Sequence, residues 1–200
     1  MPEPVGYPRG DAANWAFFPL FPLLSMGVQW VTGLAGTVSN IIVAKLLLLP
    51  AIWAFLAFQR MYRPEIPLWI GAILIALNPF SIYANTGYTE TLFILLTCLS
   101  LIAIRCDRPV LAGAMGALLA ATRVVGVGIG LPFAVYALRK VRREPNANGG
   151  KLIFAGLLIP LGLASYMFYL HAHIGDAMAF SHVQRAWDRE IGNPVVILLT

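Results

Sequence analysis

Long apolar segments with few charged residues constrain this chain more than any other feature of its sequence. A helix that crosses the hydrocarbon core of a bilayer needs about 20 mostly apolar residues. Segments that meet or approach that length are residues 17–35, 38–59, 66–84, 88–104 and 152–170. The stretch 109–138 is interrupted near Thr122 and Arg123, so we expect two short or broken helices, 109–121 and 124–138, packed as a hairpin. Hydrophobic residues make up 59% of the 200-residue chain and charged residues 12%, whereas soluble domains average about 45–50% and about 25%. We therefore expect an all-α, polytopic transmembrane helical bundle of about six to seven helices.

The basic residues are concentrated in three short clusters at the ends of these segments. Many of the 14 Lys and Arg residues belong to them: Arg60 and Arg63; Arg105 and Arg108; and Arg139, Lys140, Arg142, Arg143 and Lys151. Because cytoplasmic loops of membrane proteins are enriched in Lys and Arg, all three clusters are predicted to face the cytoplasm. Residues 78–90, the Thr122–Arg123 break and residues 171–193 are then predicted to share the outer face. Such a distribution is a topology signal and is not typical of a nucleic-acid-binding surface.

The chain is expected to contain one main domain. Residues 1–16 are predicted to be the remnant of an external loop, and residues 17–200 a transmembrane helical domain. Within that domain, 171–193 is predicted to be an external loop, and the residues from 195 onward the start of another span. Segment 17–35 is interrupted by proline, so a re-entrant or interfacial helix is the alternative to a full span.

Cysteine and histidine spacing gives no metal site. Cys98 and Cys106 are eight residues apart without a Cys-x-x-Cys motif, so we expect free thiols. His171 and His173 are two residues apart, unlike the four-residue spacing of a helical metal pair. The sequence requires no cofactor, and it is compatible with a divalent metal.

Arg123 interrupts the apolar stretch AATRVVG and is therefore a candidate functional residue. Ionisable groups within membrane segments are costly and commonly mark functional sites. A guanidinium suits bidentate binding of a phosphate. Alternatively, Arg123 extends to the interface or pairs with a carboxylate to fix helix packing.

A polar and aromatic segment, NPFSIYANTGYTE at residues 78–90, leads into the next apolar stretch. Thr89 and Glu90 are expected to cap that helix, because an acidic side chain is favourable at the positive end of the helix dipole. Glu90 is alternatively a carboxylate of an acceptor or metal site, or the partner of Arg123. Tyr88 in the same segment is a candidate contact for the substrate.

The segment after residue 170 adds further polar candidates. Gln184 and Trp187 are three residues apart on a predicted interfacial helix, where Trp commonly marks the headgroup region. Asp176 precedes them in the same segment. We expect these three side chains to contact a lipid headgroup or a sugar, a role that is compatible with an interfacial position.

Four motifs follow one another along nearly the whole chain: NWAFFPLFPLL at 14–24, NPFSIYANTGYTETLF at 78–93, AATRVVGVGIGLP at 120–132 and GDAMAFSHVQRAW at 175–187. Their order resembles that of the PIG-V-like (glycosylphosphatidylinositol mannosyltransferase II-like) enzymes. These enzymes belong to the GT-C class of multispanning glycosyltransferases.

The resemblance implies a reaction and a set of partners. The expected reaction is mannose transfer from a polyprenyl- or dolichyl-phosphate donor to a lipid-linked or glycolipid acceptor, on the non-cytoplasmic face. The expected location is the bacterial plasma membrane or the endoplasmic reticulum membrane, in contact with membrane lipids and with no nucleic acid. Such a reaction needs a cation for the departing phosphate, the role we assign to Arg123, and a carboxylate to deprotonate the acceptor hydroxyl.

The family's catalytic Asp has no clear counterpart in this sequence. The resemblance places that Asp in a D-x-x-W-Y-like stretch that ends in Gly-Tyr and precedes the FFPLFP motif. Gly6 and Tyr7 match the end of the stretch, whereas its Asp-Trp-Tyr part and the first span have no match. The chain is therefore expected to be a fragment of a longer transferase. Asp11 and Glu90 are the weaker candidates for the catalytic carboxylate.

Two other functions are compatible with the same features. Broken helices with intramembrane charges also occur in transporters, although this sequence contains no internal repeat. A truncated, inactive membrane subunit is the second alternative.

Overall fold

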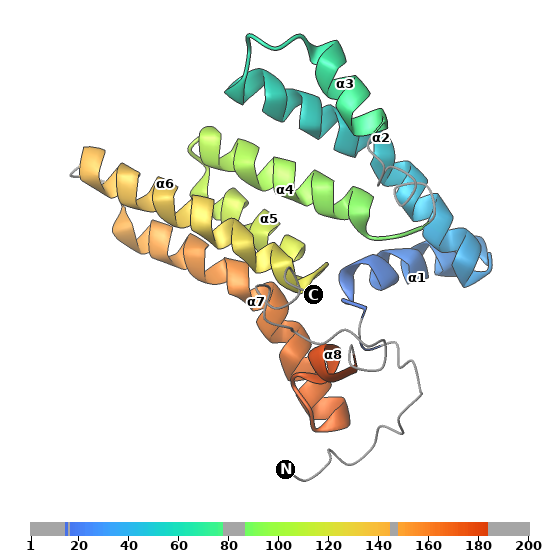
Figure 1. Cartoon of the computed structure of the whole chain (residues 1–200). Helices are drawn as coiled ribbons and strands as arrows, with labels where there is room; N and C mark the ends of the chain where they lie inside the picture. Colours follow the sequence, from blue (N-terminus) through green and yellow to red (C-terminus); the bar gives the residue numbers. More distant parts are fainter. Residues whose placement is uncertain (1–14, 16, 78–86, 145–147, 184–200) are drawn as a thin grey trace, which may run out of the picture. The chain divides into compact units, whose positions relative to one another are not determined.

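The computed structural model describes residues 15, 17–77, 87–144 and 148–183, and within these residues the protein is all-α, as predicted (Figure 1). The described elements are α1 (Leu20–Thr32), α2 (Gly36–Tyr62), α3 (Leu68–Ala76), α4 (Glu90–Arg105), α5 (Pro109–Ala120), the 3-10 helix η3 (Val124–Ile129), α6 (Gly130–Arg143), α7 (Gly149–Ile174) and α8 (Ala179–His182).

The chain forms two compact units. The larger unit comprises Phe18–Ala164 and contains α1 to α6 together with the first part of α7. The smaller unit comprises Met1–Phe17 and Ser165–Thr200, and its described part contains the end of α7 and α8. Each unit is considered separately below.

Helices α2 and α4 run in the same direction through the larger unit. Near the start of α4, a Cβ placed on Gly87 would lie 3.2 Å from Cβ of Asn40, early in α2. Near the other end, the Tyr62 hydroxyl donates a hydrogen bond to the Leu101 carbonyl over 3.2 Å. Because α5 and α6 reverse direction in turn, the end of α6 returns to the same end of the unit as the ends of α2 and α4.

Helices α5 and α7 approach each other closely because glycine occupies their contact. A Cβ added to Gly113 would lie 2.1 Å from the Ala155 carbonyl oxygen, and one added to Gly162 would lie 1.8 Å from the Ala117 oxygen. Small residues at helix contacts let two backbones approach in this way. Large side chains then fill the space beside the contact, including the buried Leu119 and Ile159.

The turn between α4 and α5 is joined to α6 by a polar cluster. Asp107 occupies this turn with φ of 58°. Its Oδ1 accepts hydrogen bonds from the Tyr136 hydroxyl at 2.5 Å and from Lys140 Nζ at 2.6 Å. Lys140 also pairs with Glu144 at 3.2 Å. The hydrogen bonds from Lys140 and Tyr136 lower the pKa of Asp107 below its usual value of 3.8.

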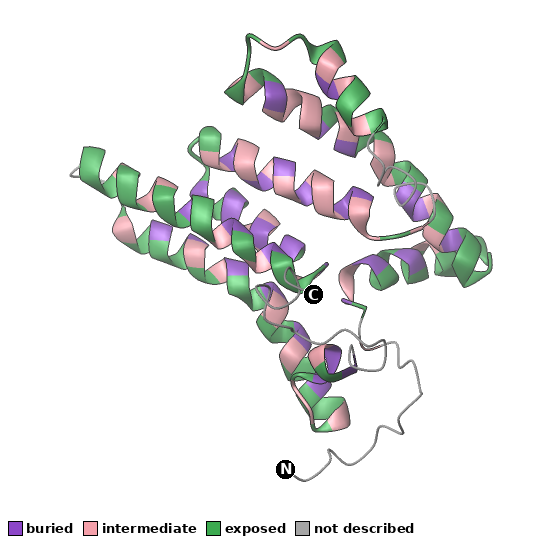
Figure 2. Ribbon diagram, viewed as in Figure 1, coloured by how far each residue is buried: buried purple, intermediate pink, exposed green. Residues whose placement is uncertain are grey.

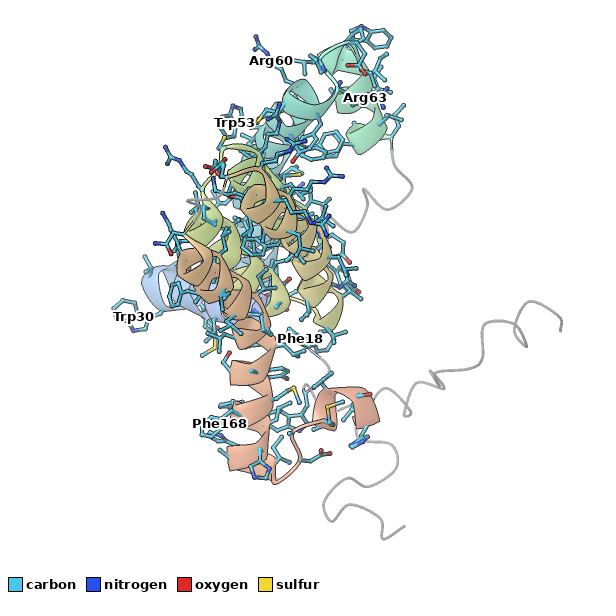
Figure 3. The ribbon with its side chains drawn as sticks, turned by 90° about the vertical axis from the view of Figure 1, so that its left-hand side faces the viewer. Phe18, Trp30, Trp53, Arg60, Arg63 and Phe168 are labelled. Carbon is cyan, nitrogen blue, oxygen red and sulfur yellow. The ribbon has the colours of Figure 1, made fainter. Side chains whose placement is uncertain are left out.

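Many residues on the outer faces of the helices are exposed (Figure 2), and large apolar residues are among them. Trp30 on α1 is 88% exposed and Trp53 on α2 is 68% exposed, and both project away from the helices that carry them (Figure 3). Monomeric soluble proteins rarely expose contiguous apolar patches of large area. The composition predicted this surface, because the chain contains more apolar residues than its interior buries.

Three described segments are long and apolar enough to cross a membrane: Gly36–Tyr62, Val124–Arg143 and Gly149–Ile174. Helices α1 and α5 are apolar but shorter, at 13 and 12 residues. At about 1.5 Å per residue, each is shorter than the hydrocarbon core of about 30 Å. Helix α7 continues to Ile174, and thus extends into the segment that we expected to begin an external loop at residue 171.

Alanine at the glycine contact is predicted to destabilise the larger unit. Gly113→Ala or Gly162→Ala places a methyl group against a backbone oxygen of the facing helix, so each should lower the free energy of unfolding by about 1–3 kcal/mol. Thermal unfolding in detergent measures the change. Gly27→Ala is the matched control, because no atom lies within 4 Å of the added Cβ. Equal stability of all three variants would contradict the proposed contact.

The Asp107 cluster is predicted to make stability depend on acid pH. The pKa of Asp107 is lower in the folded protein. The stability that the ionised Asp107 adds is therefore fully present above pH 3.8 and is lost as the pH falls through the folded pKa. Asp107→Asn should remove this part of the pH dependence of the melting temperature. An unchanged acid profile in the variant would show that the cluster does not contribute.

Candidate functional site

An ion pair joins the two sequence candidates Arg123 and Glu90. Arg123 Nη1 lies 3.1 Å from Glu90 Oε1, which joins the segment after α5 to the first turn of α4. The Arg123 side chain is 47% exposed and that of Glu90 is 22% exposed. The carboxylate therefore faces the helices, and the guanidinium faces outward.

The sequence around Arg123 explains why the helix is interrupted there. Thr122 Oγ1 donates a hydrogen bond of 2.6 Å to the Leu119 carbonyl, one of the last carbonyl oxygens of α5. Arg123 then adopts an extended backbone, with φ of −159° and ψ of 145°, before η3 begins. Gly126 packs so closely that a Cβ there would lie 2.4 Å from the Leu119 oxygen. The chain thus turns at Arg123 and places its side chain outside the packed helices.

Glu90 is positioned by its place in the helix and by the turn that precedes it. Gly87 has φ of 80° and packs against Asn40 of α2. Tyr88 follows and is 49% exposed. Thr89 is the N-cap residue of α4 but makes no side-chain capping bond. An acidic residue in the first turn is favoured by the helix dipole, so the expected helix-start role of Glu90 and its pairing with Arg123 coexist.

The second oxygen of Glu90 is buried without a hydrogen-bond partner among the described residues. A buried carboxylate oxygen without a partner is costly. Arg123 therefore lies beside a carboxylate that has unused acceptor capacity.

The smaller unit contains a separate polar pair, Asp176 and His182. His182 Nδ1 lies 2.7 Å from Asp176 Oδ2, and the Met178 amide donates to Asp176 Oδ1 at 2.9 Å. Burial favours the neutral form of Asp176, but the hydrogen bonds from His182 and Met178 outweigh it and lower its pKa. Because a carboxylate only accepts hydrogen bonds, Nδ1 of His182 carries the proton and Nε2 is left as an acceptor when the ring is neutral.

Asp11, Gln184 and Trp187 lie outside the described residues. His173 Nδ1 lies 3.0 Å from the Tyr169 carbonyl oxygen, four residues earlier in α7. In the described part of the chain, no group of three or more His, Cys, Asp or Glu side chains is placed to hold a metal.

The Arg123–Glu90 pair and the basic clusters lie at opposite ends of the larger unit. Glu90 begins α4, whereas Arg105 ends it. The ends of α2 and α6 lie beside the end of α4, as the Tyr62 contact with Leu101 and the Lys140 contact with Asp107 show. Within this unit, the Arg123–Glu90 pair and the basic clusters therefore lie at opposite ends, as the charge pattern predicted.

Two interactions were not anticipated from the sequence. The pairing of His182 with Asp176 was not predicted, although their spacing of six residues allows a turn to join them. The interactions of Asp107 were not predicted either, although Asp107 lies two residues before Pro109 at the start of α5, a position where a turn is expected. In both cases the signal was a short acidic side chain next to a turn.

Comparison with known proteins gives no match: no protein-family model fits the chain, and no curated protein or solved structure is significantly similar to it.

Removing the Asp176 carboxylate is predicted to open the loop after α7. Asp176→Ala removes the acceptor for the Met178 amide, so hydrogen exchange of that amide should increase by about two- to tenfold, in line with one lost hydrogen bond. Asp176→Asn keeps a carbonyl acceptor for Met178 and should show a smaller increase. Exchange of peptides that cover residues 175–183 gives the measurement, and equal exchange in all three proteins would contradict the assignment.

Proposed function

We propose that the protein is a multi-pass membrane glycosyltransferase that transfers mannose from a polyprenyl-phosphate donor to a lipid or glycan acceptor on the non-cytoplasmic face. The observation that carries the proposal is the Arg123–Glu90 pair at the end of a helical unit whose outer faces are apolar, in which the Arg123 guanidinium is half exposed. The resemblance of four ordered motifs to PIG-V-like enzymes supports the choice of reaction.

The membrane location is supported by helices that suit a bilayer. Three of them are long and apolar enough to span it, and exposed Trp, Leu and Val side chains cover their outer faces. Basic residues gather at one end of the larger unit, as expected for the cytoplasmic side of a membrane protein. Arg123 would then face the opposite side, where lipid-linked sugars are used.

Arg123 suits the phosphate of a lipid-linked donor. A guanidinium carries five N–H donors in a planar fork. Among the described residues, Arg123 Nη1 donates to Glu90 Oε1. Its other donors can bind two oxygens of a phosphate. Glu90 holds the guanidinium in place when the site is empty, because it is the less exposed partner.

The proposed reaction breaks the bond between the sugar C1 and the phosphate oxygen. The polyprenyl phosphate leaves with the electron pair, while the acceptor oxygen bonds to C1 and loses its proton to a carboxylate base. Arg123 stabilises the negative charge on the departing phosphate, an effect that is larger where water is excluded. Glu90 and Asp11 remain the candidates for the base.

Arg123 variants of the protein test the proposal. In proteoliposomes with a radiolabelled polyprenyl-phosphate mannose, Arg123→Gln should lower kcat/KM about 100-fold. Arg123→Lys should retain part of the activity, because it keeps the charge but loses the planar fork. Glu90→Gln should weaken donor binding by releasing Arg123.

Arg63→Gln is the matched control for this experiment. Arg63 also pairs with a glutamate, Glu65, but it lies at the basic end of the larger unit. Its removal should leave transfer unchanged. Unchanged turnover and donor KM in Arg123→Gln would remove Arg123 from the site, and the absence of transfer from any polyprenyl-phosphate sugar by the native protein would refute the proposed reaction.

A further inference from the structure

The basic end of the larger unit carries more positive charge than its carboxylates neutralise. Lys140 pairs with both Asp107 and Glu144. Among the described residues, five neighbouring arginines form no ion pair: Arg105, Arg108, Arg139, Arg142 and Arg143. All five are exposed.

These arginines come from helix ends that the fold brings together. Arg105 lies in the last turn of α4, and Arg108 is the N-cap residue of α5. The other three lie at the end of α6, which is joined to the α4–α5 turn by the bonds of Asp107 to Tyr136 and Lys140. A pocket of about 210 Å³ lies at the same place, lined by this turn, α6 and the start of α7. The polar cluster thus fixes the spacing of the surrounding cations.

Apolar side chains alternate with the arginines on α6. Leu138 is 60% exposed and Val141 is 52% exposed, and they flank Arg139 and Arg142 in the sequence. A nucleic acid or an acidic protein segment would satisfy the charges but would leave these side chains in water. A phospholipid can contact both kinds of side chain, because its phosphate binds the arginines and its acyl chains cover the apolar residues.

We propose that this surface, formed by Arg105, Arg108, Arg139, Arg142 and Arg143, binds the headgroups of anionic phospholipids. The inference rests on the membrane location in the proposed function, but it does not depend on the transfer reaction. Arginine suits the role because its planar fork binds phosphate oxygens in pairs. A phosphatidylglycerol headgroup has a net negative charge, whereas in a phosphatidylcholine headgroup the choline cation cancels the charge of the phosphate.

The test uses the full protein, purified in a neutral detergent, and two short-chain lipids. Native mass spectrometry and the shift in melting temperature report binding of dioctanoyl phosphatidylglycerol and of dioctanoyl phosphatidylcholine. We expect tighter binding of phosphatidylglycerol, with the preference falling as salt is raised. The triple variant Arg139→Gln, Arg142→Gln, Arg143→Gln should weaken phosphatidylglycerol binding by roughly fivefold for each charge removed.

The matched control replaces the same three arginines with lysine, which keeps the charge and should keep most of the preference. If the glutamine variant does not fold, the lysine variant and the salt titration of the native protein still test the surface. Equal binding of the two lipids by the native protein would overturn the inference. Displacement of phosphatidylglycerol by an equal concentration of inorganic phosphate would also overturn it, because the site would then recognise the free ion.

Extraction of membranes with carbonate separates this inference from the proposed function. Release of the protein by carbonate would refute the membrane location and both proposals with it. A protein that stays in the membrane but binds both lipids equally refutes only the lipid surface. Loss of mannose transfer in Arg123→Gln, with the lipid preference intact, supports the two proposals independently.

Discussion

The close contact of α5 with α7 is the constraint on which the rest of the larger unit depends. Gly113 and Gly162 let the two backbones approach to a distance that no side chain would allow. Within lipid, helix association gains little from the hydrophobic effect, so van der Waals packing of this kind carries much of the stabilisation. The position of α5 then fixes both of its ends: the turn that contains Asp107 and the break that contains Arg123.

Each end of α5 holds a different kind of polar interaction. At one end, Asp107 is bonded to Tyr136 and Lys140 of α6, and arginines surround the cluster. At the other end, Arg123 reaches Glu90 at the start of α4. The helices between them expose mainly apolar side chains. Lys45 lies within α2, and most of the other charged side chains in the described part of this unit lie at its two ends. A chain with this distribution suits an apolar layer with water on both sides.

The separation of the two ends also separates their proposed roles. One ion pair with a half-exposed guanidinium suits recognition of a single phosphate, where a fixed geometry matters. Several exposed arginines suit a surface of many headgroups, where the summed charge matters more than the position of each side chain. The same residue type therefore serves a site at one end and a surface at the other, because its neighbours differ.

The sequence alone determined the fold class, since runs of apolar residues with this little charge form helices that need an apolar environment. It also predicted Arg123 as a candidate functional residue, and Glu90 as a helix-start residue or as the partner of Arg123. The helix ends were predicted less well: α1 is shorter than the expected segment and α7 is longer. Hydropathy does not show where a helix begins or ends, because the ends depend on capping residues and turns. The pairing of Arg123 with Glu90, across 33 residues of chain, and of Asp107 with Lys140 was decided only by the tertiary structure. Helix packing brings these side chains together, and that packing depends on glycine contacts whose partners lie far apart in the sequence.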